Sequence, residues 1–375
     1  MPDTPRGGPG RRRLIRLGVG LAALLLLGVG TVGVLRSRHT GGNTPTGDPA
    51  AGGTPSAAPS TSPSPTPEPG ADITGPLTLL LVGVDTRISV PGWEPHADAV
   101  LVLHVARGLD RAYLYSLPRD LVVDIPAFAP ARFPGQRTKL THAMSYGSRV
   151  PGRRDSPDPA QGFRLLEQTV LRYTGIKRFD AGAVLTFGGL TKLVDAVGGV
   201  DLTIDQRVVS KHRRPDGSHR KLVGGDYVGP QMVYQPGPRH LVGWQALDYA
   251  RQRYITGGDY SRQRHQQQLI KALVAKMLDQ GLARDAERLE AVVRSLGDAL
   301  IPVTGGRRII DFGYALSRLP PAAITLVSLP GHGVGRGAGY RGEALDAIGV
   351  QFLAELRAGR ADAFLTAHPE LVVKD

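Results

Sequence analysis

Five charged side chains of this chain lie directly beside apolar runs of strand length: Asp85, Arg87, Asp98, Arg119 and Asp120. Carboxylates supply the hard oxygen ligands that Mg²⁺ prefers, and arginine binds phosphate oxygens through two parallel hydrogen bonds. These residue types therefore fit a site for a divalent cation and a phosphate. Solvated loop charges would give the same spacing, so the elements that carry these residues must decide between the two interpretations.

A second group of charged residues lies farther along the chain, just before and at the start of a helical segment. It comprises Arg251, Arg253, Asp259 and Arg262. Apolar residues recur at every third position before Arg251, which predicts a short helix that ends at this arginine. Asp259 or Ser261 is suited to cap the helix that follows. An arginine at a helix end can simply complement the helix dipole, whereas a helix N-terminus beside Arg262 would attract a phosphate.

Apolar runs of strand length alternate with helical segments from Leu77 onward, which predicts an α/β domain. The expected strands span residues 77–82, 99–105, 112–117, 121–125, 200–204 and 324–329. The expected helices span residues 163–173, 187–197 and a longer segment that starts near residue 259. Open α/β sheets bind ligands in the crevice at the carboxyl ends of their strands, so the charged residues are expected to meet there.

The N-terminal part of the chain predicts a membrane anchor. Residues 17–35 carry no charge and, at ~1.5 Å per residue, are long enough to cross a hydrocarbon layer of ~30 Å. Arginines are more numerous before this run than directly after it, so residues 1–16 are expected in the cytoplasm. A cleaved signal peptide is the alternative, but the run ends in LRSRH, a poor cleavage site. Residues 36–75, rich in Pro, Thr, Gly and Ser, are expected to form a disordered linker to an extracytoplasmic domain at 76–375.

Composition narrows the partners of such a single-pass protein of the cell membrane. The chain has no cysteine, which excludes disulfides, thiolate metal sites and a cysteine nucleophile. Its formal net charge of +13 suggests a polyanionic partner: nucleic acid, anionic lipid or a phosphorylated substrate. Because the domain is expected outside the cell, we expect no nucleic-acid partner.

Six motifs appear along residues 77–280 in a characteristic order: GVDTR, HADAVLVLHV, SLPRD, KLTHAMSYG, FGGLTKLVDAVGGVDLTI and GWQALDYARQRYITGGDYSRQRHQQQ. In order and spacing they resemble the LytR-CpsA-Psr family. The resemblance implies a phosphotransferase that moves a glycopolymer from a polyprenyl-pyrophosphate lipid carrier onto peptidoglycan. It also implies an α/β/α sandwich with a mixed central sheet and an apolar tunnel for the lipid tail.

The family motifs imply roles for individual residues of this chain. Asp85 and Asp98 match aspartates that bind Mg²⁺ (or Mn²⁺), and Asp259 matches the acidic residue of a GD-x-x-R motif. The residues that match phosphate-binding positions are Arg87, Arg119, Lys139, Arg251, Arg253 and Arg262. For the general base that activates the acceptor hydroxyl, the candidates are Asp120 and Asp259.

This chain departs from the family pattern at two positions. His96 and His265 stand where arginine is usual, and histidine titrates near neutrality whereas arginine stays charged. If His96 faces the phosphates, binding of the donor is expected to tighten as the pH falls through the imidazole pKa. The segment His212–Tyr227, rich in Arg, Lys and Gly, is expected to be a solvated loop, a flap over the sugar or a contact with anionic lipid.

Two other functions fit the same residues. The site could pass the phosphoryl group to water, which would make the protein a lipid-carrier pyrophosphatase. Alternatively, the protein could be a non-catalytic membrane-bound attenuator or regulator. The acceptor of the phosphoryl group distinguishes a pyrophosphatase from a transferase. The side of the membrane on which the domain lies distinguishes a regulator from an extracytoplasmic enzyme.

Overall fold

A computed structural model of the chain describes residues 68–85 and 92–374. The expected tail 1–16, the expected membrane segment 17–35, most of the expected linker and Arg87 lie outside these residues. Among the helices that the structure describes, none combines the length and the apolar character needed to cross a membrane.

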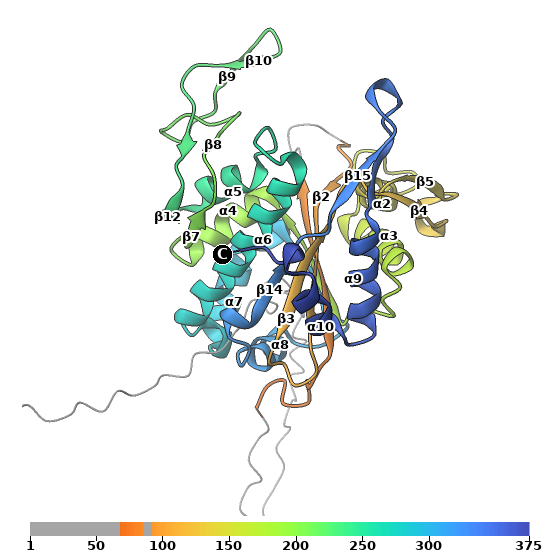
Figure 1. Cartoon of the computed structure of the whole chain (residues 1–375), viewed down its shortest axis with the longest axis vertical. Helices are drawn as coiled ribbons and strands as arrows, with labels where there is room; N and C mark the ends of the chain where they lie inside the picture. The colour runs from red at the N-terminus through yellow and green to blue at the C-terminus, as the bar shows by residue number, and fades with distance from the viewer. Residues whose placement is uncertain (1–67, 86–91, 375) are drawn as a thin grey trace, which may run out of the picture. The chain divides into compact units, whose positions relative to one another are not determined.

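A six-stranded mixed sheet forms the centre of the domain (Figure 1). Its strands, in spatial order, are β13 (Leu300–Val303), β6 (Ala181–Thr186), β1 (Leu77–Asp85), β2 (His96–Val105), β3 (Ala112–Leu117) and β14 (Ile324–Val327). β1 pairs with β6 and β3 pairs with β14 in parallel, and the other neighbours pair antiparallel. The prediction of a mixed α/β fold is therefore confirmed.

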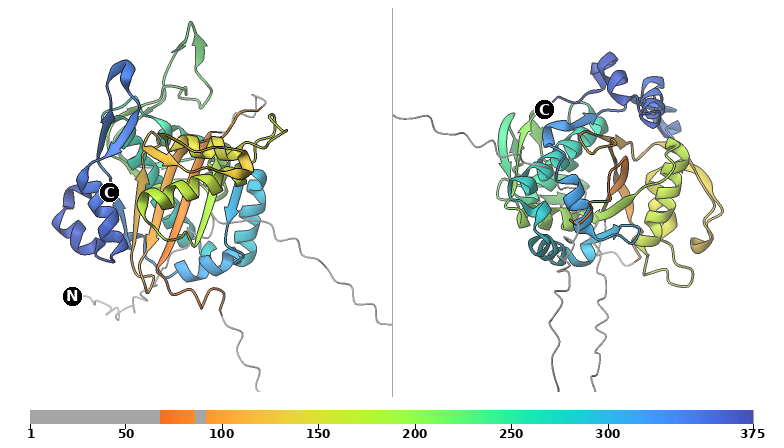
Figure 2. Two further views of the ribbon diagram at one scale, coloured as in Figure 1. Left: turned by 90° about the vertical axis from the view of Figure 1, so that its right-hand side faces the viewer. Right: turned by 90° about the horizontal axis from the view of Figure 1, so that it is seen from below.

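Helices cover both faces of the sheet, as the two views of Figure 2 show. One layer contains α4 (Phe187–Ala196), α5 (Gly243–Arg251), α6 (Gly258–Asp279), α7 (Ala286–Leu296) and α8 (Ile309–Leu316). The other contains α2 (Thr141–Ser148), α3 (Pro159–Thr174), α9 (Ala347–Arg357) and α10 (Ala361–Ala367). Because successive side chains of a strand point to opposite faces, Leu79 and Leu81 belong to one apolar core, and Leu80 and Val82 to the other.

Five short two-stranded sheets lie outside the central sheet in the part of the chain that the structure describes. They are β4 (Val122–Ile125) with β5 (Gln136–Lys139), β7 (Val200–Ile204) with β12 (Gly237–Leu241), β8 (Val208–Val209) with β11 (Val233–Tyr234), β9 (Lys221–Val223) with β10 (Asp226–Val228), and β15 (Gly331–Val334) with β16 (Gly342–Leu345). Each pair is antiparallel. Those formed by β9 with β10 and by β15 with β16 rise on the same side of the domain in Figures 1 and 2.

The expected elements exist, but their ends shift. The helix expected at 163–173 starts one turn earlier, because Pro159 suits the first helical position and Asp158 accepts a hydrogen bond from the backbone N–H of Gln161 at 2.9 Å. The long helix expected from Asp259 or Ser261 starts at Gly258 and is preceded by Gly257 at φ 83°. This left-handed turn, which glycine adopts without steric cost, sets the direction from which α6 enters the site.

The expected linker ends earlier than residue 75. Ile73 is only 7% exposed and belongs to the apolar core. Its backbone N–H donates to the carbonyl of Gly70 at 3.0 Å, and Asp72 forms an ion pair with Arg307 at 2.7 Å. The domain therefore begins near Pro69 and not at residue 76, because one aliphatic side chain is enough to fix this end of the segment on the core.

A fragment that begins at Pro69 is expected to be more stable than one that begins at Leu77. Burial of an isoleucine side chain contributes ~2 kcal/mol, and the shorter fragment loses the buried Ile73. Urea unfolding of both fragments, with Ile73→Ala in the longer one as a matched variant, measures this difference. Equal unfolding midpoints for all three proteins would show that residues 69–76 add nothing to the fold.

Candidate functional site

The strand directions bring the predicted charges to one edge of the sheet. β2 runs antiparallel to both of its neighbours, so the ends of β1 and β3 and the start of β2 lie at the same edge. Asp85 is the last residue of β1, His96 is the first of β2, and Arg119 follows β3 by two positions. The ends of two helices complete the edge, since α5 ends at Arg251 and α6 starts at Gly258.

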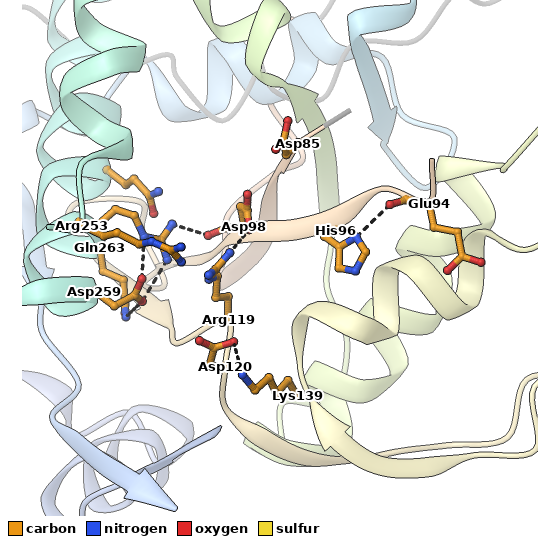
Figure 3. Close-up of polar contacts among 12 residues, drawn as sticks. Asp85, Glu94, His96, Asp98, Arg119, Asp120, Lys139, Arg253, Asp259 and Gln263 are labelled. Carbon is orange, nitrogen blue, oxygen red and sulfur yellow. Dashed lines mark hydrogen bonds and ion pairs between the residues drawn. The ribbon is translucent and has the colours of Figure 1, made fainter. Parts of the chain in front are cut away.

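A polar pocket of about 480 Å³ lies at this edge. The predicted site residues that line it are Asp85, His96, Asp98, Arg119, Asp120, Lys139, Arg251, Arg253 and Arg262. Figure 3 shows that the labelled members point toward a common space from several different elements. Asp259 lies just behind the lining, where it contacts Arg262, and Arg87 lies outside the described residues.

A β-bulge places Asp98 in the pocket. Gly83 pairs with Ala99 and Val84 pairs with Ala97, so Asp98 is the extra residue that β1 does not match. A bulge re-aims a side chain out of the regular alternation of a strand. The Asp98 carboxylate then accepts a hydrogen bond from Nη1 of Arg119 at 2.5 Å (Figure 3).

Arg119 is held as a charged donor. Burial by itself would lower the pKa of Arg119, but the negative charge of Asp98, with smaller contributions from Asp120 and Asp259, raises this pKa above its ordinary value. Its buried Nε has no hydrogen-bond partner among the described residues. Since buried polar groups are normally hydrogen-bonded, this N–H is suited to an anionic ligand in the pocket.

Other pocket-lining residues also have buried polar atoms that are unpartnered within the described part of the chain: Thr141 Oγ1, His212 Nδ1 and Gln266 Oε1. Such atoms are rare in native proteins and often mark a site that a ligand or water completes. Their presence in the same pocket as Arg119 therefore supports a polar ligand there.

Arg262 connects the start of α6 to the bulge. Its guanidinium donates to both carboxylate oxygens of Asp259, at 2.8 and 3.0 Å, and to the carbonyl of Asp98 at 2.5 Å. Burial by itself would raise the pKa of Asp259, but Arg262 and Gln263 hold it below its ordinary value. A carboxylate stabilised in this way is a weak base, so the geometry favours a positioning role for Asp259.

Lys139 and Arg251 both line the pocket. The ammonium of Lys139 forms an ion pair with Asp120 at 3.2 Å and lies 4.9 Å from the ring centroid of Tyr340. The guanidinium of Arg251 lies 4.5 Å from the ring centroid of Phe187. Cation–π contacts of this kind help to hold both cations in place in the pocket wall.

A small apolar cavity of about 60 Å³ adjoins the polar pocket and shares Phe187, Arg251 and Gln266 with it. It lies between the sheet and helices α4, α5 and α6, and its remaining lining residues are Leu81, Val82, Gly83, Ala99, Leu101, Leu185, Thr186, Leu190, Leu247, Ala250, Leu269 and Ile270. In this conformation the apolar cavity is too small to hold a polyprenyl chain, so the expected lipid tunnel stays a prediction. Large aliphatic side chains from the sheet and the helices fill most of the space between them.

Several pocket-lining residues were not predicted as site residues: Trp93, Thr141, His142, Phe187, Lys211, His212, Tyr227, Gln252, Tyr254 and Gln266. Thr141 and His142 belong to the motif KLTHAMSYG, which was the available signal for them. Lys211, His212 and Tyr227 come from the segment around the strand pair of β9 with β10, which the sequence left open between loop and flap. These three residues line the pocket only because that segment folds back beside it, which the sequence does not show.

His265 does not lie in the pocket. It is completely buried, its Nε2 pairs with Asp205 Oδ1 at 2.9 Å, and its ring stacks on Tyr249 with centroids 4.2 Å apart. The departure from arginine at position 265 therefore lies outside the pocket. His96 does line the pocket, where its Nδ1 lies 2.9 Å from the carbonyl oxygen of Glu94 (Figure 3).

His212 is expected to titrate near pH 4 in the ligand-free protein and at higher pH when pyrophosphate is bound. Burial, together with Arg251 and Lys211, lowers the pKa of His212 to about 4. A bound polyanion opposes these positive charges and raises this pKa. The pKa of His212 is then higher in the complex than in the free protein. By linkage, the affinity for pyrophosphate increases as the pH falls from the higher of these two pKa values toward the lower one.

Imidazole NMR titrations with and without inorganic pyrophosphate measure this shift. His104 is the matched control, because its pKa is also lowered by burial but its Nδ1 contacts Thr78, near the opposite end of β1. Equal responses of His104 and His212 to pyrophosphate would place the anion outside the pocket.

The carboxylates present fit a divalent cation that arrives with a phosphate. Within the described residues there is no group of three or more His, Asp or Glu side chains arranged as a complete metal site. Asp85 and Asp98 nevertheless line the same pocket. Mg²⁺ is commonly held by one or two carboxylates while water and substrate phosphates supply its other ligands, so this donor set is sufficient.

Curated relatives match about half of this chain. Biofilm regulatory protein A of Streptococcus mutans is 28% identical over 208 residues, which cover 54% of this chain and 44% of the relative. The polyisoprenyl-teichoic acid–peptidoglycan teichoic acid transferase TagU of Enterococcus faecalis is 30% identical over 208 residues, 54% of each chain. The chain thus spans about half the length of these relatives.

Solved structures share the fold. Protein gbs0355 of Streptococcus agalactiae superposes with a TM-score of 0.58 at 21% identity and covers 78% of this chain and 89% of its own. The structure of TagT bound to LI-WTA gives a TM-score of 0.52 at 21% identity and covers 75% and 89%. The family model for LytR_cpsA_psr matches residues 50–359. This chain therefore belongs to the LytR-CpsA-Psr family.

Proposed function

We propose that this protein transfers a glycopolymer from a polyprenyl-pyrophosphate carrier onto peptidoglycan and leaves a phosphodiester link. The observation that carries the proposal is the junction of two environments at Phe187 and Arg251, where a cationic pocket meets an apolar cavity. A lipid pyrophosphate has the same two parts, a polyanion joined to a hydrocarbon tail. The name of the relative TagU, a transferase of teichoic acid to peptidoglycan, supports the same class of reaction.

Some pocket residues are proposed to bind the phosphates or the cation, and others fix the positions of these binding residues. Arg119, Arg251 and Arg253 would bind the pyrophosphate oxygens, and the unpartnered Nε of Arg119 is the donor best prepared for them. Asp85 and Asp98 would hold Mg²⁺ or Mn²⁺, which when bound would stabilise negative charge on the phosphates. Arg262 fixes the backbone of Asp98 and thereby the direction of its carboxylate.

The reaction requires an acceptor hydroxyl next to the phosphate that carries the glycan. The hydroxyl oxygen forms a bond to this phosphorus, and the bridging P–O bond to the lipid phosphate breaks. The products are a glycan phosphodiester and polyprenyl monophosphate, and the hydroxyl proton passes to a base. We assign this base to Asp120, because it lines the pocket, whereas Asp259 lies behind the lining and is held by Arg262 and Gln263.

The lipid tail would enter where the small apolar cavity begins. Since about 60 Å³ cannot hold a polyprenyl chain, α4, α5 or α6 must move away from the sheet to admit it. The interface between these helices and the sheet is apolar, so each methylene that enters gains ~0.8 kcal/mol relative to water.

Ala99→Leu is expected to weaken binding of a polyprenyl pyrophosphate about tenfold and to leave inorganic pyrophosphate binding unchanged. The added side chain occupies the cavity that Ala99 lines and excludes about two methylene groups of the tail. Equilibrium binding of both ligands, with a thermal melt of the variant as a folding control, measures this difference. Unchanged affinity for the lipid would mean that the tail binds elsewhere.

The proposed function is tested with the full chain in lipid vesicles, a labelled lipid-linked glycan and purified peptidoglycan. We expect covalent attachment of the label to insoluble peptidoglycan and release of polyprenyl monophosphate. Formation of free glycan phosphate at the same rate with and without peptidoglycan would identify a pyrophosphatase instead. Absence of any cleavage in the presence of Mg²⁺ and Mn²⁺ would favour a non-catalytic regulator.

The location of the protein follows from the same proposal. Lipid-linked glycan and peptidoglycan meet on the outer side of the cell membrane, which agrees with an anchor at residues 17–35 and an extracytoplasmic domain. Protease treatment of intact cells that removes the domain and leaves the N-terminal tail protected would support this orientation. Protection of the domain would contradict it.

A further inference from the structure

The hairpin formed by β9 and β10 exposes an apolar tip. Leu222, Val223 and Val228 are 58%, 49% and 44% exposed, and they are three of the few large apolar side chains at the surface of the described domain. Gly224 and Gly225 form the turn at φ 58° and 91°, the left-handed values that a tight two-residue hairpin turn requires. The tip thus presents aliphatic side chains to solvent on a well-defined turn.

The base of this hairpin is built to hold the tip away from the core. The Arg220 guanidinium donates to the carbonyls of Lys211, Tyr227 and Gly229 at 2.8, 2.7 and 3.1 Å. Tyr227 lines the polar pocket and packs edge-on against His212 at 4.9 Å. These contacts fix the hairpin beside the pocket while its tip projects away from the domain in Figures 1 and 2.

Basic residues outnumber acidic ones in the segment that carries the apolar tip. Between positions 211 and 228 the basic residues are Lys211, Arg213, Arg214, Arg220 and Lys221, and the acidic ones are Asp216 and Asp226. An apolar tip flanked by Lys and Arg is the combination that enters the interface of an anionic bilayer, because the cations meet lipid phosphates while the aliphatic groups leave water. A soluble glycan would instead favour polar and aromatic groups at the tip.

A second hairpin contacts two residues of the pocket wall, Asp120 and Lys139. The loop between β15 and β16 carries Arg336, Tyr340 and Arg341, and Tyr340 is also exposed. The backbone N–H of Glu343 donates to the carbonyl of Asp120 at 2.8 Å, which joins this hairpin to the pocket wall. Tyrosine and arginine at an exposed tip are typical of membrane interfaces.

We propose that the two hairpins, residues 211–230 and 331–345, rest on the surface of an anionic bilayer and turn the mouth of the pocket toward the membrane. Both hairpins project in the same direction in Figure 1, from the end of the sheet where β1 ends and β2 starts, and residues of that end line the pocket. The described chain begins at residue 68, shortly before β1, and the start of β1 lies at the opposite end of that strand from Asp85. Residues 36–68 are numerous enough to span up to ~100 Å, so an anchor at 17–35 permits this orientation.

The test uses the absence of cysteine from the chain. Leu222→Cys in the full chain is labelled with a polarity-sensitive fluorophore, and the protein is reconstituted into phosphatidylcholine vesicles with or without phosphatidylglycerol. Val350→Cys on α9 is the matched control, because Val350 is 51% exposed and lies outside both hairpins. The readouts are the emission wavelength and quenching by nitroxide-labelled lipids.

We expect a blue shift and lipid quenching at position 222 in vesicles that contain phosphatidylglycerol, a several-fold weaker signal at high salt, and neither effect at position 350. Lys221→Gln added to Leu222→Cys should reduce the signal in the same direction as salt. Equal signals at the two positions, a signal that follows protein density and not lipid charge, or a shift that appears only when soluble glycan is added would overturn the proposal. The labelling needs no donor, so its outcome is independent of the transfer reaction.

Discussion

Asp98→Ala is expected to reduce glycan transfer at least about 100-fold while the domain remains folded. The β-bulge aims the Asp98 carboxylate into the pocket, where it both orients Arg119 and is proposed to bind the cation. Loss of a single group that stabilises developing charge typically costs between ~100-fold and ~1,000-fold in turnover. The variant should also lose its response to added Mg²⁺, measured as the transfer rate with and without chelator.

Asp124→Ala is the control for this variant. Asp124 also forms an ion pair with an arginine, Arg137 at 2.7 Å, but this pair is exposed and outside the pocket. We expect near-normal transfer for Asp124→Ala. Asp98→Ala should lower the free energy of unfolding by about 1 kcal/mol, since it leaves the partly buried Arg119 without its closest partner. Full activity of Asp98→Ala, or equal activity with and without chelator in the unmodified protein, would remove the cation from the account.

Arg119→Ala is expected to impair donor binding as well as turnover, with kcat/KM reduced ~100-fold to ~1,000-fold. Arg119 lines the pocket, its Nη1 is held by Asp98, and its buried Nε has no partner among the described residues, so the guanidinium is fixed beside the space proposed for the phosphate. Arg119→Lys retains the charge but loses the planar pair of donors, and we expect it to recover only a small part of the activity.

The measurement for this variant separates binding from chemistry. Affinity is determined with the lipid pyrophosphate in the absence of acceptor, and turnover is determined at saturating donor. Arg137→Ala, an exposed arginine outside the pocket, should match the unmodified protein in both. An Arg119→Ala variant with unchanged affinity and reduced turnover would mean that Arg119 contacts only the transition state.

The strands and the site edge could be predicted because they depend on local patterns. The apolar run 112–117 matches β3, and the run 200–204 matches β7. Asp85, Arg119 and Asp120 follow buried strands, so their convergence needs only the shared direction of β1 and β3. Family motifs then supplied Lys139 and Arg251, whose positions no local pattern would have placed in the same pocket.

Features that depend on long-range packing could not be read from the sequence. The buried contact of His265 with Asp205 requires α6 to lie beside the end of β7, sixty positions earlier in the chain. Ile73 lies in a segment of linker-like composition, and only the core that it meets makes it part of the domain. The narrow apolar cavity likewise reflects how closely the helices pack on the sheet.

The ion pair of Asp98 with Arg119 also could not be predicted from the sequence. It changes the expected effect of removing Asp98 on the stability of the domain. Two neighbouring carboxylates would repel each other, so removal of Asp98 would be expected to stabilise a protein without metal. The ion pair with Arg119 offsets that repulsion. Its loss is therefore expected to destabilise the domain.

The central claim is that the phosphate attached to the glycan moves to peptidoglycan. A donor labelled with ³²P only in that phosphate, given to the full chain in vesicles together with peptidoglycan, follows this atom directly. The account predicts ³²P in insoluble peptidoglycan, release of unlabelled polyprenyl monophosphate, and at least about 100-fold slower formation of both with Asp98→Ala. Recovery of ³²P in the lipid, or as soluble glycan phosphate without attachment to peptidoglycan, would contradict it.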